Sequence, residues 1–284
     1  MINYHRVCPP SPIGGPDLNV TPESFRQQIE GLLAAGWSGV RVGDICDAAA
    51  AHRTLPRRRF AITFDDAFAS VHEFALPILR ELGVPATVYL ATQHVDSEQP
   101  FPFDPWHGKG GVGPACDRSF WQPISRAQCD ELLEAGWELG AHTATHRDFS
   151  RCKSEFADDL GESVDWLARH YGITQPTFSY PYGLVDAELA SAVQAAGCRA
   201  GLTTESRLIR PGDDPFWWGR FGAEDGESAA MLLGKLTGWF ETFRGAWRGL
   251  LRGRRPSAAA PNAVARPATK HTVEPADTYH EARA

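Results

Sequence analysis

The chain has 284 residues, of which 43% are hydrophobic and 22% charged, as is usual for a globular protein with a large buried core. Its 28 basic and 35 acidic residues give a formal net charge of −7, which argues against a nucleic-acid-binding protein, because such proteins usually carry a basic face. No run of about 18 apolar residues exists and the N-terminus lacks an apolar signal core, so we expect a cytoplasmic protein. The six cysteines include no Cys-x-x-Cys pair and are expected to be reduced thiols.

Predicted strands and helices alternate along the first 200 residues. Residues 60–65 are predicted to form a buried strand, 68–82 an amphipathic helix that ends at Gly83, and 85–91 the next strand. The same order recurs downstream, with helices predicted at 125–135, 153–171 and 185–196 and strands at 137–141, 177–181 and 198–204. Such alternation predicts an α/β fold with a parallel sheet and crossover helices, and an incomplete or complete barrel rather than two separate domains.

The C-terminal part differs from this pattern. Residues 228–255 carry apolar side chains at helical spacing, and between 235 and 255 there are six basic residues and one acidic residue. This helix either lies on an anionic membrane surface or packs on the barrel as a terminal helix. In 256–284, 13 of 29 residues are Ala or Pro, which predicts a disordered tail. The expected division is therefore a domain at 1–227, the helix and the tail.

Two adjacent carboxylates end the strand predicted at 60–65. Catalytic groups of parallel α/β folds cluster at the carboxyl ends of strands. Because neighbouring residues point in different directions there, one carboxylate of Asp65 and Asp66 can bind a metal while the other stays free for proton transfer. The alternative is a surface turn that happens to contain two aspartates.

Two histidines follow the strand predicted at 137–141. His142 and His146 are four residues apart, so both can face one way across a helical turn, which is a spacing of metal ligands. The alternative is a pair of solvated loop histidines. Combined with an aspartate from the neighbouring strand end, they predict a three-ligand site with open coordination positions, as in catalytic zinc sites.

A Pro- and Gly-containing turn follows the strand predicted at 177–181. The segment Ser179-Tyr180-Pro181-Tyr182-Gly183 can expose a backbone N–H beside the site, and such a donor stabilises an oxyanion. An ordinary turn is the alternative interpretation.

Taken together and in this order, four segments resemble the polysaccharide deacetylase family, also called the NodB-homology or carbohydrate esterase 4 family. The segments are Tyr4-His5-Arg6-Val7, Thr63-Phe64-Asp65-Asp66, His142-Thr143-Ala144-Thr145-His146 and Phe178-Ser179-Tyr180-Pro181-Tyr182-Gly183. The first is typical of the branch that acts on amino-sugar polymers. The resemblance covers residues 1–222 and implies a distorted (β/α)7-type barrel that removes acetyl groups from N-acetylated sugars with the help of a metal.

The resemblance also implies a role for each matching residue. Asp66, His142 and His146 would hold a divalent metal ion, with zinc as the expected ion. Asp65 would be the general base that takes a proton as hydroxide attacks the amide carbon. The Tyr182 N–H would share the resulting oxyanion with the metal.

The sequence departs from the family pattern at three places. Ala67 stands where the family has Gly, and Ser179 stands where it has an Arg that orients the base. We expect Arg220, in a segment similar to a late strand of the family, to supply that positive charge instead. The usual Leu-x-His, whose histidine serves as general acid, is absent, and His5 is the candidate replacement. A structural histidine bonded to a neighbouring strand is the alternative for His5.

Aromatic side chains are the candidates for contact with sugar rings. The predicted substrate contacts are Tyr180, Trp106 and Trp218, although core packing is the more common use of tryptophan. Trp106 lies in residues 96–122, a long loop rich in Pro, Gly and aromatics that is expected to be functional or disordered.

The expected function is that of a metal-dependent hydrolase that releases acetate from amino sugars of a saccharide or glycolipid precursor. In a cytoplasmic protein the substrate would be lipid-linked, nucleotide-linked or a small glycoside, and the helix at 228–255 would place the protein peripherally at the inner membrane surface. A deformylase or another amide hydrolase on the same scaffold stays open, as does a saccharide-binding protein with little turnover.

Overall fold

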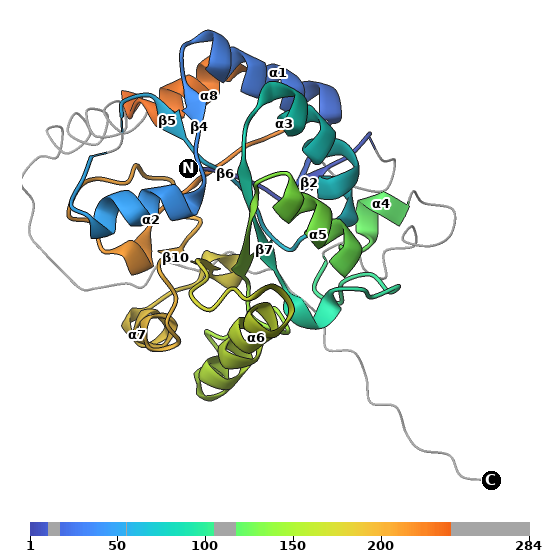
Figure 1. Ribbon diagram of the computed structural model, residues 1–284, viewed down its shortest axis with the longest axis vertical. Coiled ribbons are helices and arrows are strands. Elements are labelled where there is room, and N and C mark those ends of the chain that lie inside the picture. The colour runs from blue at the N-terminus through green and yellow to red at the C-terminus, as the bar shows by residue number, and fades with distance from the viewer. Residues whose placement is uncertain (11–17, 55, 105–117, 240–284) are drawn as a thin grey trace, which may run out of the picture. The chain divides into compact units, whose positions relative to one another are not determined.

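The computed structural model describes residues 1–10, 18–54, 56–104 and 118–239. A seven-stranded sheet with the order β10-β9-β8-β7-β6-β1-β11 forms its centre, and every pairing in it is parallel (Figure 1). The strands are β1 (Ile2–Tyr4), β6 (Ile62–Phe64), β7 (Ala86–Leu90), β8 (Glu138–Ala141), β9 (Phe178–Ser179), β10 (Gly201–Leu202) and β11 (Phe221–Gly222). Two short parallel pairs accompany the sheet, β2 (Arg6–Val7) with β3 (Asn19–Val20) and β4 (Ser38–Gly39) with β5 (Arg59–Phe60).

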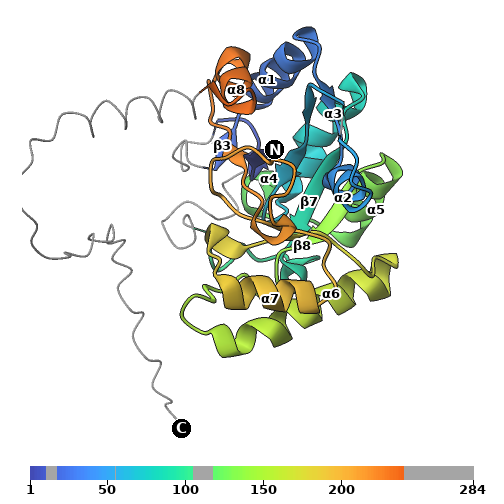
Figure 2. The same ribbon diagram turned by 90° about the vertical axis from the view of Figure 1, so that its left-hand side faces the viewer.

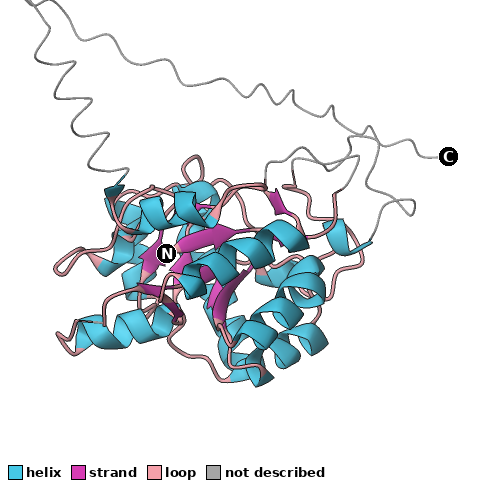
Figure 3. Cartoon of the chain, turned by 90° about the horizontal axis from the view of Figure 1, so that it is seen from above, coloured by secondary structure: helices cyan, strands magenta, loops and turns pink. Residues whose placement is uncertain are grey.

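Helices surround the strands (Figure 3). They are α1 (Pro22–Ala34), α2 (Val42–Ala50), α3 (Leu76–Leu82), α4 (Arg118–Trp121), α5 (Arg126–Glu134), α6 (Phe156–Tyr171), α7 (Ala187–Ala195) and α8 (Ala229–Leu236). A π-helical turn, Val71–Ala75, precedes α3. Helices α6 and α7 lie side by side (Figure 2).

Local sequence signals set the helix ends. Ser125 begins α5 with a capping box that it shares with Gln128, and the carboxylate of Asp186 accepts two backbone N–H groups at the start of α7. Gly83 ends α3 in the left-handed conformation, with φ +65°. The helices and strands predicted between residues 60 and 202 are present, with shorter strands than expected.

The sheet curls until its two edge strands approach the same segment. Trp218 forms a parallel bridge with Leu202 of β10, and the Thr203 N–H donates to the Trp218 carbonyl at 2.8 Å. Five residues after Trp218, the Ala223 N–H donates to the carbonyl of Asn3 in β1 at 3.0 Å. The expected distorted (β/α)7-type barrel is thereby confirmed, and its closing segment carries the residue at position 220 into the interior.

The structure describes only part of the C-terminal segment for which a helix and a tail are predicted. Helix α8 packs on α1 so closely that a Cβ atom on Gly31 would lie 2.2 Å from the Cβ of Ala229. This contact fits the terminal-helix interpretation for the described part of 228–255, whereas residues 240–255 and the predicted tail at 256–284 lie outside the described residues. Within the described ranges no helix has the length and apolarity needed to cross a membrane.

Arg6 fixes the loop segments beside the carboxyl ends of the strands. Its side chain is completely buried, pairs with the buried carboxylate of Asp104 and donates from Nε to the Phe120 carbonyl at 2.8 Å. The guanidinium carbon also lies 3.8 Å from the ring centroid of Phe68. One buried charge therefore holds together segments on both sides of residues 105–117.

We predict that Asp104→Asn lowers the free energy of unfolding by about 3–5 kcal/mol, because it leaves the buried guanidinium of Arg6 without its counter-charge. Chemical denaturation measures this change. The control is Glu81→Gln, which removes an ion pair of Arg26 with a side chain that is 64% exposed, and there we expect little or no change, because solvent screens an exposed pair. Equal effects of the two substitutions would contradict the prediction.

Candidate active site

The three side chains predicted to hold a metal lie together at the carboxyl end of the sheet. One ligand atom from each of Asp66, His142 and His146 lies within 4.8 Å of the other two, and all three residues are buried. The Nε2 atoms of His142 and His146 lie 3.4 Å and 3.1 Å from Oδ1 of Asp66. Asp66 follows β6, and His142 follows β8, two strands away in the sheet.

A turn, and not the helical turn expected from the spacing, brings the two histidines together. Thr143 and His146 adopt left-handed backbone conformations, with φ of 64° and 58°, and Asp66 does so with φ of 67°. Non-glycine residues rarely adopt this conformation, and such residues cluster at functional sites where the surroundings enforce it. The conformation redirects each side chain at the point where its strand ends.

Asp159 on α6 enforces the histidine turn. Its carboxylate accepts hydrogen bonds from the Ala144 N–H at 2.7 Å, the Thr145 N–H at 3.1 Å and the Thr145 hydroxyl at 2.6 Å. Asp159 belongs to none of the sequence motifs described above. A signal was present, because Asp159 stands on the face of α6 that Phe156, Leu160 and Leu167 bury, and a charged side chain there needs a buried partner.

The donor set fits a divalent cation. Nδ1 of His142 lies 2.7 Å from the carbonyl oxygen of Ser179, and since a carbonyl only accepts, Nδ1 carries a hydrogen and Nε2 is the ring atom that can bind a cation once it is deprotonated. Burial alone would raise the pKa of Asp66, but the charge and hydrogen bonds of His146 and His142 lower it well below its usual range. Two imidazole nitrogens and one carboxylate oxygen match catalytic zinc sites.

Aromatic rings hold His146 in place. Phe103 stacks on its imidazole at a centroid distance of 3.8 Å, and Tyr182 meets the ring edge-on at 4.8 Å. The Nδ1 atom of His146 has no hydrogen-bond partner among the described residues. Packing therefore orients this ring, whereas a hydrogen bond from Nδ1 orients the ring of His142. Nothing in the sequence distinguishes Phe103 from the other aromatics of its loop.

Asp65 forms a two-point ion pair with Arg220. Nη1 of Arg220 lies 2.7 Å from Oδ1 of Asp65, Nη2 lies 2.8 Å from Oδ2, and both side chains are buried. Burial would raise the pKa of Asp65, but the guanidinium charge and hydrogen bonds of Arg220, with help from His142, lower it to about 2. The carboxylate therefore stays anionic at all ordinary pH values.

The rest of the Arg220 side chain is also fully bonded. Nη2 donates to the Ser179 hydroxyl at 2.8 Å, and Nη1 donates to Oδ1 of Asn3 at 2.8 Å. Nδ2 of Asn3 in turn donates to Asp65 at 3.1 Å. The guanidinium of Arg220, which is expected to replace the arginine that the family has at position 179, thus contacts the small side chain of Ser179. Asn3 was not recognised from the sequence, because an isolated Asn at the start of a strand carries no distinctive pattern.

His5 and Tyr182 lie around the same site. His5 is half-buried, and burial, together with the charges of Arg220 and Arg6, lowers its pKa by more than the charges of Asp66 and Asp65 raise it. Tyr182 is 51% exposed, with φ 58°, within the short 3-10 turn Pro181–Gly183. In the first turn of a helical segment the backbone N–H groups have no partner from within that segment, so the Tyr182 N–H is a candidate donor.

Two of the aromatic residues predicted to contact sugar rings are buried in the core. Tyr180 is 1% exposed and its hydroxyl donates to the Phe216 carbonyl at 3.1 Å, while Trp218 is 2% exposed and packs in a buried cluster with Leu202. Both rings stabilise the core, which is the commoner use of large aromatics. Trp106 lies outside the described residues.

Comparison with known proteins gives a consistent picture. The family model described as polysaccharide deacetylase matches residues 52–201. A poly-beta-1,6-N-acetyl-D-glucosamine N-deacetylase of Staphylococcus epidermidis is 25% identical over 236 residues, which is 76% of this chain and 75% of that protein. The protein of the same name from Staphylococcus aureus is 26% identical over 197 residues, or 66% of this chain and 61% of its own length.

Solved structures show the same fold. The deacetylase PplD of Streptococcus pyogenes, in complex with acetate, superposes with a TM-score of 0.70 at 19% identity over 83% of this chain and 96% of that one. IcaB from Ammonifex degensii superposes with a TM-score of 0.65 at 25% identity over 78% and 90% of the two chains.

We predict that the stability cost of Arg220→Met depends on pH. The wild-type pair contributes stability above pH 3.8, the ordinary pKa of Asp, and loses it as the pH falls towards the folded pKa of about 2. The difference in the free energy of unfolding between wild type and variant should therefore shrink by about 2 kcal/mol or more from pH 5 to pH 2. Denaturant titrations at each pH measure it.

Ser179→Ala is the matched control, because it removes one neutral hydrogen-bond partner of the same guanidinium. We expect a loss of about 1 kcal/mol that stays constant over this pH range. A pH-independent gap for Arg220→Met would mean that the ion pair does not stabilise the fold through the ionised form of Asp65.

Proposed function

Since the chain belongs to the polysaccharide deacetylase family, we propose that it is a hydrolase that removes N-acetyl groups from polymers or oligomers of N-acetylglucosamine. The observation that carries this proposal is the pairing of two buried carboxylates with different partners at one end of the barrel. Asp66 lies against two imidazoles and Asp65 against a guanidinium. This arrangement provides a cation site and a separate anionic proton acceptor beside it.

Asp66, His142 and His146 would hold a divalent cation, and zinc is the ion that this donor set favours. When bound, such a cation supplies Lewis acidity, which polarises an amide carbonyl and makes water easier to deprotonate. The Ser179 carbonyl keeps His142 in the tautomer that binding requires.

Asp65 would accept the proton of the attacking water. A carboxylate offers about four acceptor positions, and three hydrogen bonds, two from Arg220 and one from Asn3, use all but one of them. The remaining position is available to water. Because the pKa of Asp65 is about 2, the group is always ionised but is a weak base, so it works only on a water molecule that is already acidified.

The remaining steps concern the oxyanion and the leaving amine. The Tyr182 N–H would donate to the carbonyl oxygen as negative charge develops on it. His5 would pass a proton to the leaving nitrogen, and because its pKa is lowered it must first gain that proton within the reaction cycle. The products would be acetate and a free amino sugar.

We also propose, from the sequence, that the metal-dependent reaction takes place in the cytoplasm on a lipid-linked, nucleotide-linked or small glycoside substrate, with residues 228–255 in contact with the inner membrane surface. A panel of such substrates beside poly-β-1,6-N-acetylglucosamine oligomers decides between carriers. N-formyl analogues in the same panel test the alternative of a deformylase.

We predict that Asp65→Asn lowers the rate of acetate release from β-1,6-linked N-acetylglucosamine oligomers by about 10²–10⁴-fold, because the amide cannot accept a proton. Enzymatic detection of acetate measures the rate. The variant should keep its bound cation and its affinity for the oligomer. Wild-type protein that binds the oligomer but releases no acetate would instead support a saccharide-binding protein.

We predict that His142→Ala removes both zinc binding and activity, because a two-ligand site holds a cation much less tightly. Mass spectrometry of protein-bound metals measures the first effect and acetate release the second. Chelation of wild type should abolish activity, and added zinc should restore it. The control is His170→Ala, because His170 is exposed in the last turn of α6 and is not one of the three clustered residues. This variant should keep its full zinc content. Unchanged zinc content in His142→Ala would refute the site.

A further inference from the structure

A cavity of about 790 Å³ lies at the end of the barrel opposite the cation site. Its lining includes Met1 and Ala61, which precede β1 and β6, and Arg199, which precedes β10. Because the sheet is parallel, these residues lie at the amino ends of the strands, whereas Asp66 and His142 follow the carboxyl ends. The volume is within the roughly 300–1,000 Å³ that is usual for small-molecule sites.

The interior of this cavity is apolar. Met1, Cys46, Ala61 and Trp218 belong to one buried cluster, and Ile209 packs against it. Burial raises the pKa of the Cys46 thiol to about 12, so the group is neutral.

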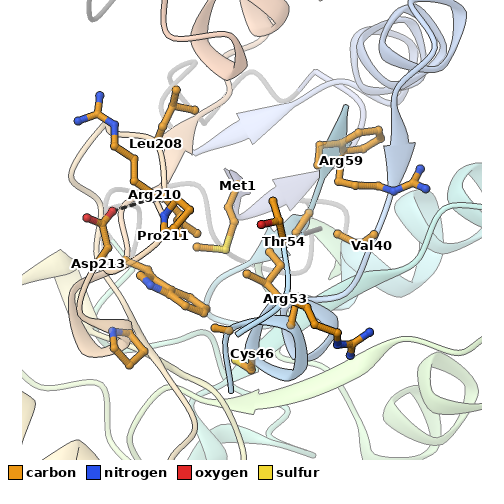
Figure 4. A pocket seen from close by; sticks show the side chains of 18 of the residues that line it. Met1, Val40, Cys46, Arg53, Thr54, Arg59, Leu208, Arg210, Pro211 and Asp213 are labelled. Carbon is orange, nitrogen blue, oxygen red and sulfur yellow. Dashed lines mark hydrogen bonds between the residues drawn. The ribbon is translucent and has the colours of Figure 1, made fainter. Parts of the chain in front are cut away.

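The margin of the cavity is basic. Five arginines line it, with a single carboxylate from Asp213; they are Arg53, Arg58, Arg59, Arg199 and Arg210. Figure 4 shows Arg53, Arg59 and Arg210 with their guanidinium groups at the outer margin around Met1 and Cys46. Arg199 pairs with Asp47 and Arg210 also has a partner, whereas no ion pair of Arg53 or Arg59 is found within the part of the chain that the structure describes. This excess of positive charge occurs in a chain whose net charge is −7.

We propose that this cavity binds an amphiphilic anion, with one hydrocarbon chain over the apolar interior and its carboxylate or phosphate among the arginines at the margin. Charge complementarity selects an anion over a neutral or cationic amphiphile. It also disfavours the chain's own continuation as the occupant, because residues 240–284 contain eight basic and four acidic residues and are therefore net positive. The site is separate from the deacetylase centre, so binding can be measured without reference to activity.

Calorimetric titration of the full chain with myristate, below its micelle concentration, tests the proposal. We expect saturable one-to-one binding in the micromolar range, with a negative heat-capacity change from burial of the hydrocarbon chain. Decanoate should bind at least ~tenfold more weakly because four methylenes fewer are buried. Tetradecanol and tetradecyltrimethylammonium, which lack the negative charge, should also bind at least ~tenfold more weakly.

Two variants address the two halves of the site. The double variant Arg53→Ser with Arg59→Ser should weaken myristate binding at least ~tenfold. The control is Arg57→Ser with Arg80→Ser, which changes the net charge equally at exposed positions outside the cavity and should not weaken binding. Ala49→Trp, at an exposed α2 position that lines the cavity, should block the chain, and Ala34→Trp on α1 is its control. Thermal unfolding verifies that every variant is folded.

Vesicles identify the source of the anion. Binding to phosphatidylglycerol vesicles that competes with myristate and is lost in the Arg53 and Arg59 double variant points to a membrane lipid. Myristate binding without vesicle binding points to a free fatty acid, and either result supports the proposal. It is overturned if myristate does not saturate, if the uncharged or cationic analogues bind equally well, or if the cavity variants bind like their controls.

Discussion

The ion pair between Asp65 and Arg220 is the interaction on which the site depends. It joins the end of β6 to the segment that closes the barrel, 155 residues later in the chain. A buried carboxylate and a buried guanidinium are each unfavourable alone, so the pair is stable only while both segments keep their places. The hydroxyl of Ser179 and the amide of Asn3 complete the bonding of the guanidinium. Barrel closure and the charge state of Asp65 therefore depend on the same interaction.

Two adjacent aspartates acquire different chemistry because the backbone turns between them. The left-handed conformation of Asp66 directs its carboxylate towards two imidazoles, while Asp65 remains beside the guanidinium. Burial would raise the pKa of each carboxyl group, and in each case nearby positive or hydrogen-bonding partners reverse that effect. Two carboxylates can thus have different electrostatic surroundings without any difference in residue type. This needs only a difference in the partners that each carboxylate meets.

The two ends of the barrel differ in what they bury. The carboxyl end buries charged and imidazole groups in a bonded network, whereas the amino end surrounds a hydrophobic cavity with arginines. A parallel sheet makes such a division simple, because the residues before and after each strand lie at opposite edges of the sheet. The amino end can therefore bind a second molecule without disturbing the groups around Asp65.

By itself, the sequence determined the alternation of strands and helices, the helix ends at Ser125 and Gly83, and the polar motifs that follow β6 and β8, because these depend on hydrophobic periodicity and on short-range capping. Only the tertiary structure decided that Tyr180 and Trp218 are core residues, since an aromatic ring can either pack in a core or contact a sugar. Only it showed that Asp159, Asn3 and Phe103 support the site, because their partners are distant in sequence or carry no distinctive pattern. Local patterns fix which groups stand at the strand ends, whereas the partners that set their charge and direction come from chain closure over long separations.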